Sequence, residues 1–220
     1  RSLKEKEILE EQIDAEVIRR LTARHGKSHA RRYRLTGWIR AADKPVIILI
    51  GGSTGTGKST LATELAFRLG IRLVTSTDMI RETLRTVLSP EVVPGLHDHS
   101  FRGIVQAGEA LSDPRERVLA GFHQQCSQVA VGVRGVVRRA ARENAHMIIE
   151  GTHIRPPFSQ YIPPTVDVYS TGFVLAVPEE ARHKARFPER AQSQASRDPA
   201  TYLEAFQSVR WIHDDLLLAA

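Results

Sequence analysis

The chain has 220 residues, of which 41% are hydrophobic, and its mean hydropathy is -0.26. This length and apolar content are enough for the core of one ordinary domain, or of one domain with an appendage. We find no apolar run near the roughly 18 residues of a membrane helix, and no secretory signal, so we expect a cytoplasmic protein without a membrane partner.

Charge and cysteine content narrow the class of partner. The single cysteine, Cys126, cannot form an intramolecular disulfide, which agrees with a reducing compartment. The formal net charge of +6 is compatible with nucleic acid, but arginine supplies most of it, and guanidinium groups suit small phosphorylated ligands equally well. Aromatic residues make up only 6% of the chain, whereas nucleic-acid binders interleave aromatics with basic residues. We therefore expect a small anionic partner rather than nucleic acid; the sequence does not predict the oligomeric state.

The first 43 residues have a helical pattern. Apolar residues recur at nearly helical spacing over residues 3–24, with acidic residues early and arginines late, as the helix dipole favours. We expect His25 and Gly26 to end this helix and Ser28 to cap a second one that runs through Ile39. We interpret residues 1–43 as a helical appendage packed on the main domain, with a separate regulatory function as the alternative.

The rest of the chain is organised around residues 46–69. Residues 46–50 read Val-Ile-Ile-Leu-Ile, which is typical of a strand buried on both faces of a parallel sheet. Residues 51–60 follow as Gly-Gly-Ser-Thr-Gly-Thr-Gly-Lys-Ser-Thr, and Gly52 to Ser59 match the pattern G-x-x-x-x-G-K-[ST]. An Ala- and Leu-rich helical pattern then continues to Leu69. This order predicts a strand, a phosphate-binding loop and a helix.

The residue types in this loop suit a nucleoside triphosphate. Its glycines let successive backbone N–H groups surround the β-phosphate, and the N-terminus of the next helix points to the same place. Lys58 adds a mobile charge for the β- and γ-phosphates, and the Ser59 hydroxyl is a hard ligand for Mg²⁺, so ATP and Mg²⁺ are the expected cofactors. The alternative is a glycine-rich turn that fits by chance. The predicted nucleotide-binding residues are Gly52, Ser53, Thr54, Gly55, Thr56, Gly57, Lys58, Ser59 and Thr60.

A second strand is predicted over residues 71–75, followed by a helix that begins at Thr77 or Asp78. Asp78, Arg81 and Arg85 then share one helical face, at positions i, i+3 and i+7. Ligands of open α/β sheets bind at the carboxyl ends of strands, so we predict that Asp78 orients or deprotonates an attacking hydroxyl. Arg81 and Arg85 are predicted to bind an anionic acceptor. The alternative is a helix-capping carboxylate with two solvated arginines.

Residues 86–113 are rich in Pro, Gly and His, and we interpret them as an insertion that covers the acceptor. His97 and His99 lack a third suitably spaced ligand, so polar contacts or surface positions are favoured over a metal site. A long helix is predicted from Asp113 to about Asn144, and Gln125 and Gln128 on it are candidates to face the site.

Residues 146–150 predict a third buried strand that ends in a carboxylate. This pattern is typical of the second nucleotide motif, which holds Mg²⁺ directly or through water, so Glu150 is a predicted magnesium ligand with Ser59. The alternative is an incidental acid at a strand end. His153 follows at the same edge of the sheet and is a predicted acceptor-binding residue.

A fourth strand is predicted over residues 166–177, followed by a basic segment. We interpret this segment as a mobile lid in which Arg186 and Arg190 neutralise charge on the transferring phosphoryl group, with a solvated basic helix as the alternative. A last amphipathic helix is predicted over residues 199–218. The predicted catalytic residues are Lys58, Asp78, Arg186 and Arg190.

Taken together, the motifs resemble the archaeal-type 2-phosphoglycerate kinases and their bacterial relatives, within the P-loop kinases. The resemblance rests on residues 48–60, on Ser-Thr-Asp-Met-Ile-Arg at 76–81, on Glu-Gly-Thr-His at 150–153 and on His-Lys-Ala-Arg-Phe at 183–187. It implies an α/β fold with a parallel sheet between helical layers. It also implies transfer of the ATP γ-phosphoryl group to the hydroxyl of 2-phosphoglycerate, giving 2,3-bisphosphoglycerate.

The same resemblance suggests how the chain divides. It makes residues 1–43 a candidate remnant of a regulatory nucleotide-binding cone, and residues 44–220 a P-loop kinase domain that is truncated at its C-terminus. Three other functions stay open at this point: a P-loop kinase for another acceptor, such as the nucleotide sugars used by zeta-toxin-like kinases, a nucleotide-sensing module without phosphoryl transfer, and a basic nucleic-acid-binding NTPase.

Overall fold

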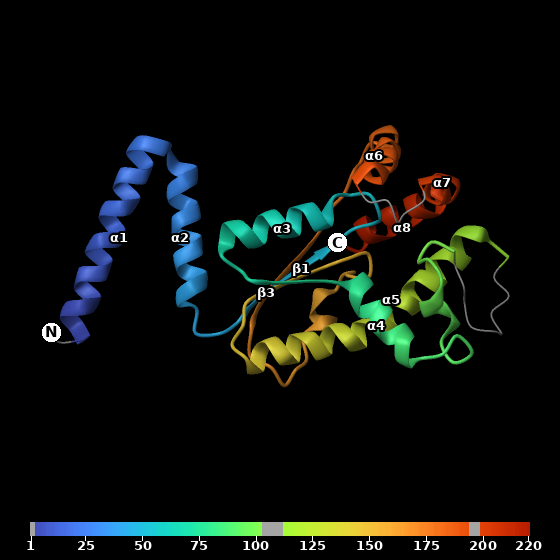
Figure 1. Cartoon of the computed structure of the whole chain (residues 1–220), viewed down its shortest axis with the longest axis horizontal. Helices are drawn as coiled ribbons and strands as arrows, with labels where there is room; N and C mark the ends of the chain where they lie inside the picture. Colours follow the sequence, from blue (N-terminus) through green and yellow to red (C-terminus); the bar gives the residue numbers. More distant parts are fainter. Residues whose placement is uncertain (1–2, 103–111, 194–198) are drawn as a thin grey trace.

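A computed structural model describes residues 3–102, 112–193 and 199–220, and within these ranges the side chains of 3–10, 189–193 and 199 are not described. The chain alternates strands and helices after two N-terminal helices (Figure 1). The elements are α1 (Leu3–His25), α2 (Lys27–Ala41), β1 (Val46–Gly51), α3 (Lys58–Leu69), β2 (Leu73–Ser76), α4 (Thr77–Val87), the 3-10 helix η1 (Pro94–His97), α5 (Pro114–Arg142), β3 (Met147–Glu150), the 3-10 helix η2 (Phe158–Tyr161), β4 (Tyr169–Val174), α6 (Glu180–Ser193), α7 (Pro199–Glu204) and α8 (Phe206–Leu218).

The strands form one parallel, four-stranded sheet with the order β2-β3-β1-β4. Ile48 in β1 lies opposite Ile148 in β3 and Thr171 in β4. Every residue of β1 is buried, as expected for an apolar strand with a neighbour on each side. The predicted α/β class is therefore confirmed, and the carboxyl ends of all four strands meet at one edge.

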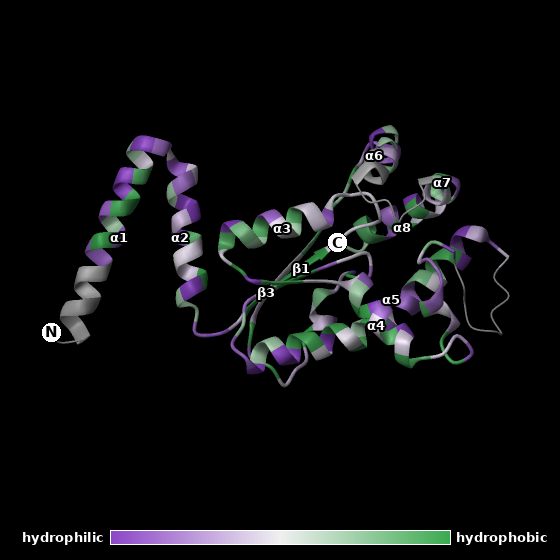
Figure 2. Cartoon of the chain, viewed as in Figure 1, coloured by the Kyte–Doolittle hydropathy of each residue, from purple (hydrophilic) through white to green (hydrophobic). Residues whose placement is uncertain are grey.

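Helices lie on both sides of the sheet (Figures 1 and 2), and alternate residues of β1 belong to two different apolar clusters. Ile48 and Ile50 pack with residues of α3 on one face. Ile47 and Leu49 pack with residues of α4 and α5 on the other. A third apolar cluster joins α5, α6 and α8, and contains Phe122, Phe187 and Phe206 among others. The helices thus fix the sheet from both sides and leave its carboxyl edge for a site.

Helices α1 and α2 form a hairpin that extends away from the sheet in Figure 1. Ile39 of α2 is 2% exposed and packs in the same cluster as α3, which anchors the hairpin. The predicted cap is wrong: Gly26, with a φ of 87°, is the N-cap of α2, so no side chain caps this helix. Glycine tolerates that positive φ, and Ser28 lies inside the helix instead. The division into residues 1–43 and 44–220 stays a prediction.

The last predicted helix is two helices. Ala205 separates α7 from α8, with a ψ of 12° that departs from helical geometry. The break lets the Tyr202 ring stack on Phe187 of α6 at a centroid distance of 5.7 Å while Phe206 is buried in the third cluster. Two strands are also shorter than predicted, since the sheet pairs only residues 73–76 and 169–174 in place of 71–75 and 166–177.

Candidate functional site

The predicted phosphate loop lies between β1 and α3, at the carboxyl edge of the sheet. Gly52 is packed so closely that a Cβ atom there would lie 2.4 Å from the backbone oxygen of Leu175. Gly57 ends the loop as the N-cap of α3 with a φ of 96°, a left-handed conformation that side chains disfavour. The glycines therefore permit a tight loop whose backbone turns directly into the start of a helix, the geometry that binds anions.

Two side chains at the start of α3 have partners across the loop. The Lys58 side chain is buried, and its Nζ donates a hydrogen bond to the backbone oxygen of Ser53 at 2.8 Å. The Ser59 hydroxyl donates to Glu150 Oε1 at 2.9 Å. Glu150 ends β3, next to β1, so the sheet brings these two predicted magnesium ligands together. A hydroxyl and a carboxylate fit Mg²⁺, which takes its other ligands from phosphates and water.

Beside the loop lies a cavity of about 340 Å³. It collects residues from five segments that are distant in sequence, one of which is residues 99–101 after η1. They include Thr54 of the phosphate loop, Asp78 and Arg81 of α4, Thr152 and His153 after β3, and Tyr202 of α7. Because this cavity is lined by a carboxylate and a guanidinium and adjoins a phosphate loop, it can hold a small polar molecule next to a nucleotide.

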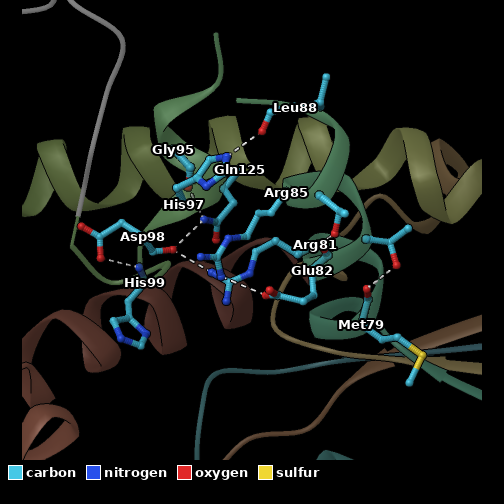
Figure 3. A network of polar contacts seen from close by, with 12 residues as sticks. Met79, Arg81, Glu82, Arg85, Leu88, Gly95, His97, Asp98, His99 and Gln125 are labelled. Carbon is cyan, nitrogen blue, oxygen red and sulfur yellow. Dashed lines mark hydrogen bonds and ion pairs between the residues drawn. The ribbon is translucent and has the colours of Figure 1, made fainter. Parts of the chain in front are cut away.

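Helix α4 presents Asp78 and Arg81 to this cavity. Its N-cap is Ser76, whose side chain accepts from the backbone N–H of Met79 at 3.1 Å, so Asp78 is not the capping residue. Arg81 Nη1 donates to the backbone oxygen of Asp98 at 2.7 Å (Figure 3). This contact holds the guanidinium against the segment that follows η1.

The third predicted residue of α4 has a different position. Arg85 Nη1 forms an ion pair with Glu82 at 2.9 Å, and the Arg85 side chain is 32% exposed. Figure 3 shows this pair. Arg85 does not line the cavity that Asp78 and Arg81 share. The structure therefore brings together two of the three residues on this helical face.

His153 is 1% exposed, and both of its ring nitrogens have protein partners. Nδ1 lies 2.9 Å from Thr77 Oγ1, and Nε2 lies 2.7 Å from Gln125 Oε1. Burial lowers the pKa of His153 to about 4, and the nearby Asp78 carboxylate opposes this shift. The ring is therefore neutral near pH 7.

The basic segment after β4 forms α6, which packs on the phosphate loop. His183 Nε2 lies 2.7 Å from the backbone oxygen of Thr54, and Arg186 Nη1 donates to the backbone oxygen of Thr56 at 2.8 Å. Arg190 lies on the same helix, and its side chain is outside the described residues. The structure thus places Arg186 at the loop.

Sequence reasoning gave no role to two residues that support this contact. His183 is fully buried, and Arg210 of α8 approaches its Nδ1 at 3.4 Å while donating to the backbone oxygen of Val177 at 2.9 Å. Burial lowers the pKa of His183. The i, i+3 spacing of His183 and Arg186 was a usable signal, because it puts both on one face. Nothing in the local sequence points to Arg210.

The histidines of the insertion make polar and aromatic contacts. His97 Nε2 lies 2.7 Å from the backbone oxygen of Leu88, and the His99 ring stacks on Phe101 at a centroid distance of 4.9 Å. Among the described residues, no group of three or more His, Cys, Asp or Glu side chains is arranged to hold a metal ion. Gln125 lies behind the cavity, whereas buried Gln128 Oε1 has no hydrogen-bond partner within the described ranges.

Comparison with known proteins identifies the family. The chain is 37% identical to a 2-phosphoglycerate kinase of Pyrococcus furiosus over 218 residues, which cover 98% of this chain and 69% of that protein. It is 36% identical to the one of Thermococcus kodakarensis, with 96% and 70% covered. The chain belongs to the 2-phosphoglycerate kinase family.

The match to this family is partial in length. A 2-phosphoglycerate kinase of Methanopyrus kandleri is 39% identical over 207 residues, which cover 92% of this chain but 62% of that relative. No family model matches the chain.

In residues 3–102, 112–193 and 199–220, none of the helices has the length and apolar character of a membrane span.

Proposed function

We propose that the protein transfers the γ-phosphoryl group of ATP to the hydroxyl of 2-phosphoglycerate, giving 2,3-bisphosphoglycerate. The observation that carries this proposal is the shared cavity, in which Asp78 and Arg81 lie beside Thr54 of the phosphate loop. Membership of the 2-phosphoglycerate kinase family supports the choice of acceptor.

In this proposal, the nucleotide phosphates bind along the loop of residues 52–60. Lys58 exchanges its hydrogen bond with the Ser53 carbonyl for a phosphate oxygen, and Arg186 likewise turns from the Thr56 carbonyl to the transferring group. Both side chains already lie at the loop, so each needs only a local movement. Ser59 and Glu150 would hold Mg²⁺, which would offset the negative charge of the phosphates.

The acceptor occupies the cavity. Arg81 binds an anionic group of 2-phosphoglycerate, because a guanidinium matches phosphate and carboxylate geometry. Asp78 lies one helical turn earlier and orients the attacking hydroxyl toward the γ-phosphorus. Phosphoryl transfer through a loose transition state depends mainly on such positioning and on charge neutralisation. Arg190 is proposed as a second lid cation, and Arg85 and His153 as supports of the acceptor side.

The test compares acceptors and variants. ATP consumption is measured with 2-phosphoglycerate, with 3-phosphoglycerate, with glycerate and with a nucleotide sugar. We expect turnover with 2-phosphoglycerate alone, and a fall of about 100-fold or more in Lys58→Ala, since one lost electrostatic contact to a transition state has that effect. Lys44→Ala is the matched control, because Lys44 precedes β1 and pairs with Asp167 at the opposite edge of the sheet.

Three results would reject the proposal. An unchanged rate in Lys58→Ala would remove the phosphate loop from the reaction. Turnover with the nucleotide sugar instead of 2-phosphoglycerate would support the zeta-toxin-like alternative, and hydrolysis stimulated only by nucleic acid would support a nucleic-acid-dependent NTPase.

A further inference from the structure

Behind the cavity, hydrogen bonds close a ring that begins and ends on α4. Thr77 contacts His153, and His153 contacts Gln125. Gln125 Nε2 donates to the backbone oxygen of Asp98 at 3.2 Å, and Arg81 donates to that same oxygen at 2.7 Å. Figure 3 shows the part of the ring in which Gln125 and Arg81 converge on Asp98. Thr77 and Arg81 are four residues apart, so Asp78 lies between the two ends of the ring.

The partners of Gln125 fix the direction of every hydrogen bond in this ring. Its Nε2 also donates to the backbone oxygen of Gly95, and carbonyl oxygens only accept. Gln125 Oε1 therefore faces His153 and must accept from it. The proton of the neutral imidazole consequently lies on Nε2, which leaves Nδ1 as the acceptor for the Thr77 hydroxyl.

The side chains of this hydrogen-bonded ring are buried, so the loss of a hydrogen-bond partner there lowers the stability of the fold. Gln125 is 2% exposed, His153 is 1% exposed and Thr77 is fully buried. A buried polar group that loses its partner keeps its full desolvation cost, so each member constrains its neighbours. The ring also joins four separate segments: α4, the loop after β3, α5 with Gln125, and the segment after η1.

We propose that Gln125 is a positioning residue that, through His153 and Asp98, holds the start of α4 and the Arg81 guanidinium in place for the acceptor. This inference rests on the proposed function for the identity of the acceptor. Gln125 itself does not line the cavity, so it acts through residues that do.

Kinetics provide the first test. In Gln125→Leu, the backbone oxygens of Gly95 and Asp98 lose a donor and His153 loses an acceptor. We expect the KM for 2-phosphoglycerate to rise about 10-fold, as the loss of one or two buried hydrogen bonds predicts, while the KM for ATP changes less than about 2-fold. Gln124→Leu, on the same helix, is the control. Equal loss of affinity for both substrates, or an unchanged KM for the acceptor, overturns the positioning role.

Two substitutions at Thr77 separate the role of its hydroxyl from the role of its shape. Thr77→Ser keeps the hydroxyl that donates to Nδ1 and should retain the acceptor KM within about 2-fold. Thr77→Val has nearly the same shape but no donor, and should raise that KM by about 5- to 10-fold. If Ser and Val behave alike, packing and not the hydrogen bond is what matters at this position, and the ring has no positioning role.

A spectroscopic test does not depend on turnover. Nitrogen-15 NMR of the histidine rings, with His153 assigned by the loss of its signals in His153→Asn, reports which nitrogen carries the proton. We expect a neutral ring protonated at Nε2, and in Gln125→Glu a ring that takes up a second proton at higher pH because a carboxylate faces it. Asp78, Arg81 and Lys58 also act on this ring and are unchanged in that variant.

The outcomes separate the two proposals. Suppose that no acceptor is phosphorylated but the His153 imidazole carries its proton on Nε2. The proposed function then fails while the network of hydrogen bonds stands, and Gln125 has no acceptor to position. If 2-phosphoglycerate is phosphorylated but His153 carries its proton on Nδ1, or titrates near its ordinary value of about 6.5, the ring is wrong as described.

Discussion

His153 should make the protein lose stability in mild acid. Its pKa is lowered to about 4 in the folded chain by burial, against about 6.5 in an unfolded chain. Between these values the unfolded chain binds a proton that the folded chain does not. The stability from the neutral ring is therefore complete above pH 6.5 and is lost as the pH falls toward 4.

The size of the effect follows from the difference between the two pKa values. One unit corresponds to 1.36 kcal/mol, so the interval amounts to about 3 kcal/mol of unfolding free energy. Because a domain is commonly stable by about 5–15 kcal/mol, this loss is large enough to measure.

Urea unfolding at pH 7.0, 5.5 and 4.5 measures this contribution. We expect the unfolding free energy of the wild type to fall with pH by up to about 1.4 kcal/mol per unit more than that of His153→Asn. His29→Asn is the control, because His29 is exposed on α2. If the wild type and His153→Asn show the same slope, the argument from burial is refuted.

Three further changes test other parts of the structure. Gly135 in α5 has open space around its missing Cβ, so Gly135→Ala should raise the unfolding free energy by about 0.5–1 kcal/mol and the Tm by a few degrees. Gly132→Ala should lower it by about 1–3 kcal/mol, because the added Cβ would lie 2.4 Å from Ile80; calorimetry showing the same sign for both would contradict this. The buried Cys126 thiol has a raised pKa, so a thiol reagent should label it only in urea, and rapid labelling of the folded protein would disprove its burial.

The sequence by itself determined the central unit of this protein. This unit consists of local features: the apolar run of residues 46–50, the glycine pattern and the helix to Leu69. The residue types and their spacing predict the conformation of each one. The strand ending at Glu150 was predictable for the same reason. Parallel strands share one carboxyl edge, so the sequence placed Glu150 at the same edge as Ser59, while the pairing of β3 with β1 in the folded sheet brought the two side chains into contact.

The lining of the cavity beside the phosphate loop was decided by tertiary structure. Asp78, Arg81 and Arg85 share a helical face in sequence terms, yet Arg85 turns to Glu82 and does not reach the cavity. Helical spacing determines which face of the helix a residue lies on. The neighbouring segment then decides which side chain on that face finds a hydrogen-bond partner. Here the Asp98 carbonyl selects Arg81.

The sequence named His153 and Gln125 as candidates, but no local signal gave the hydrogen bonds between them and Thr77. Thr77 and His153 are 76 positions apart, and Gln125 is 28 positions from His153. Hydrogen bonds between such residues exist only after the sheet and helices have packed, and a buried glutamine or threonine carries no pattern that names its partner. Periodicity therefore predicts the elements and the phosphate loop, whereas the pairing of buried polar groups depends on the packed structure alone.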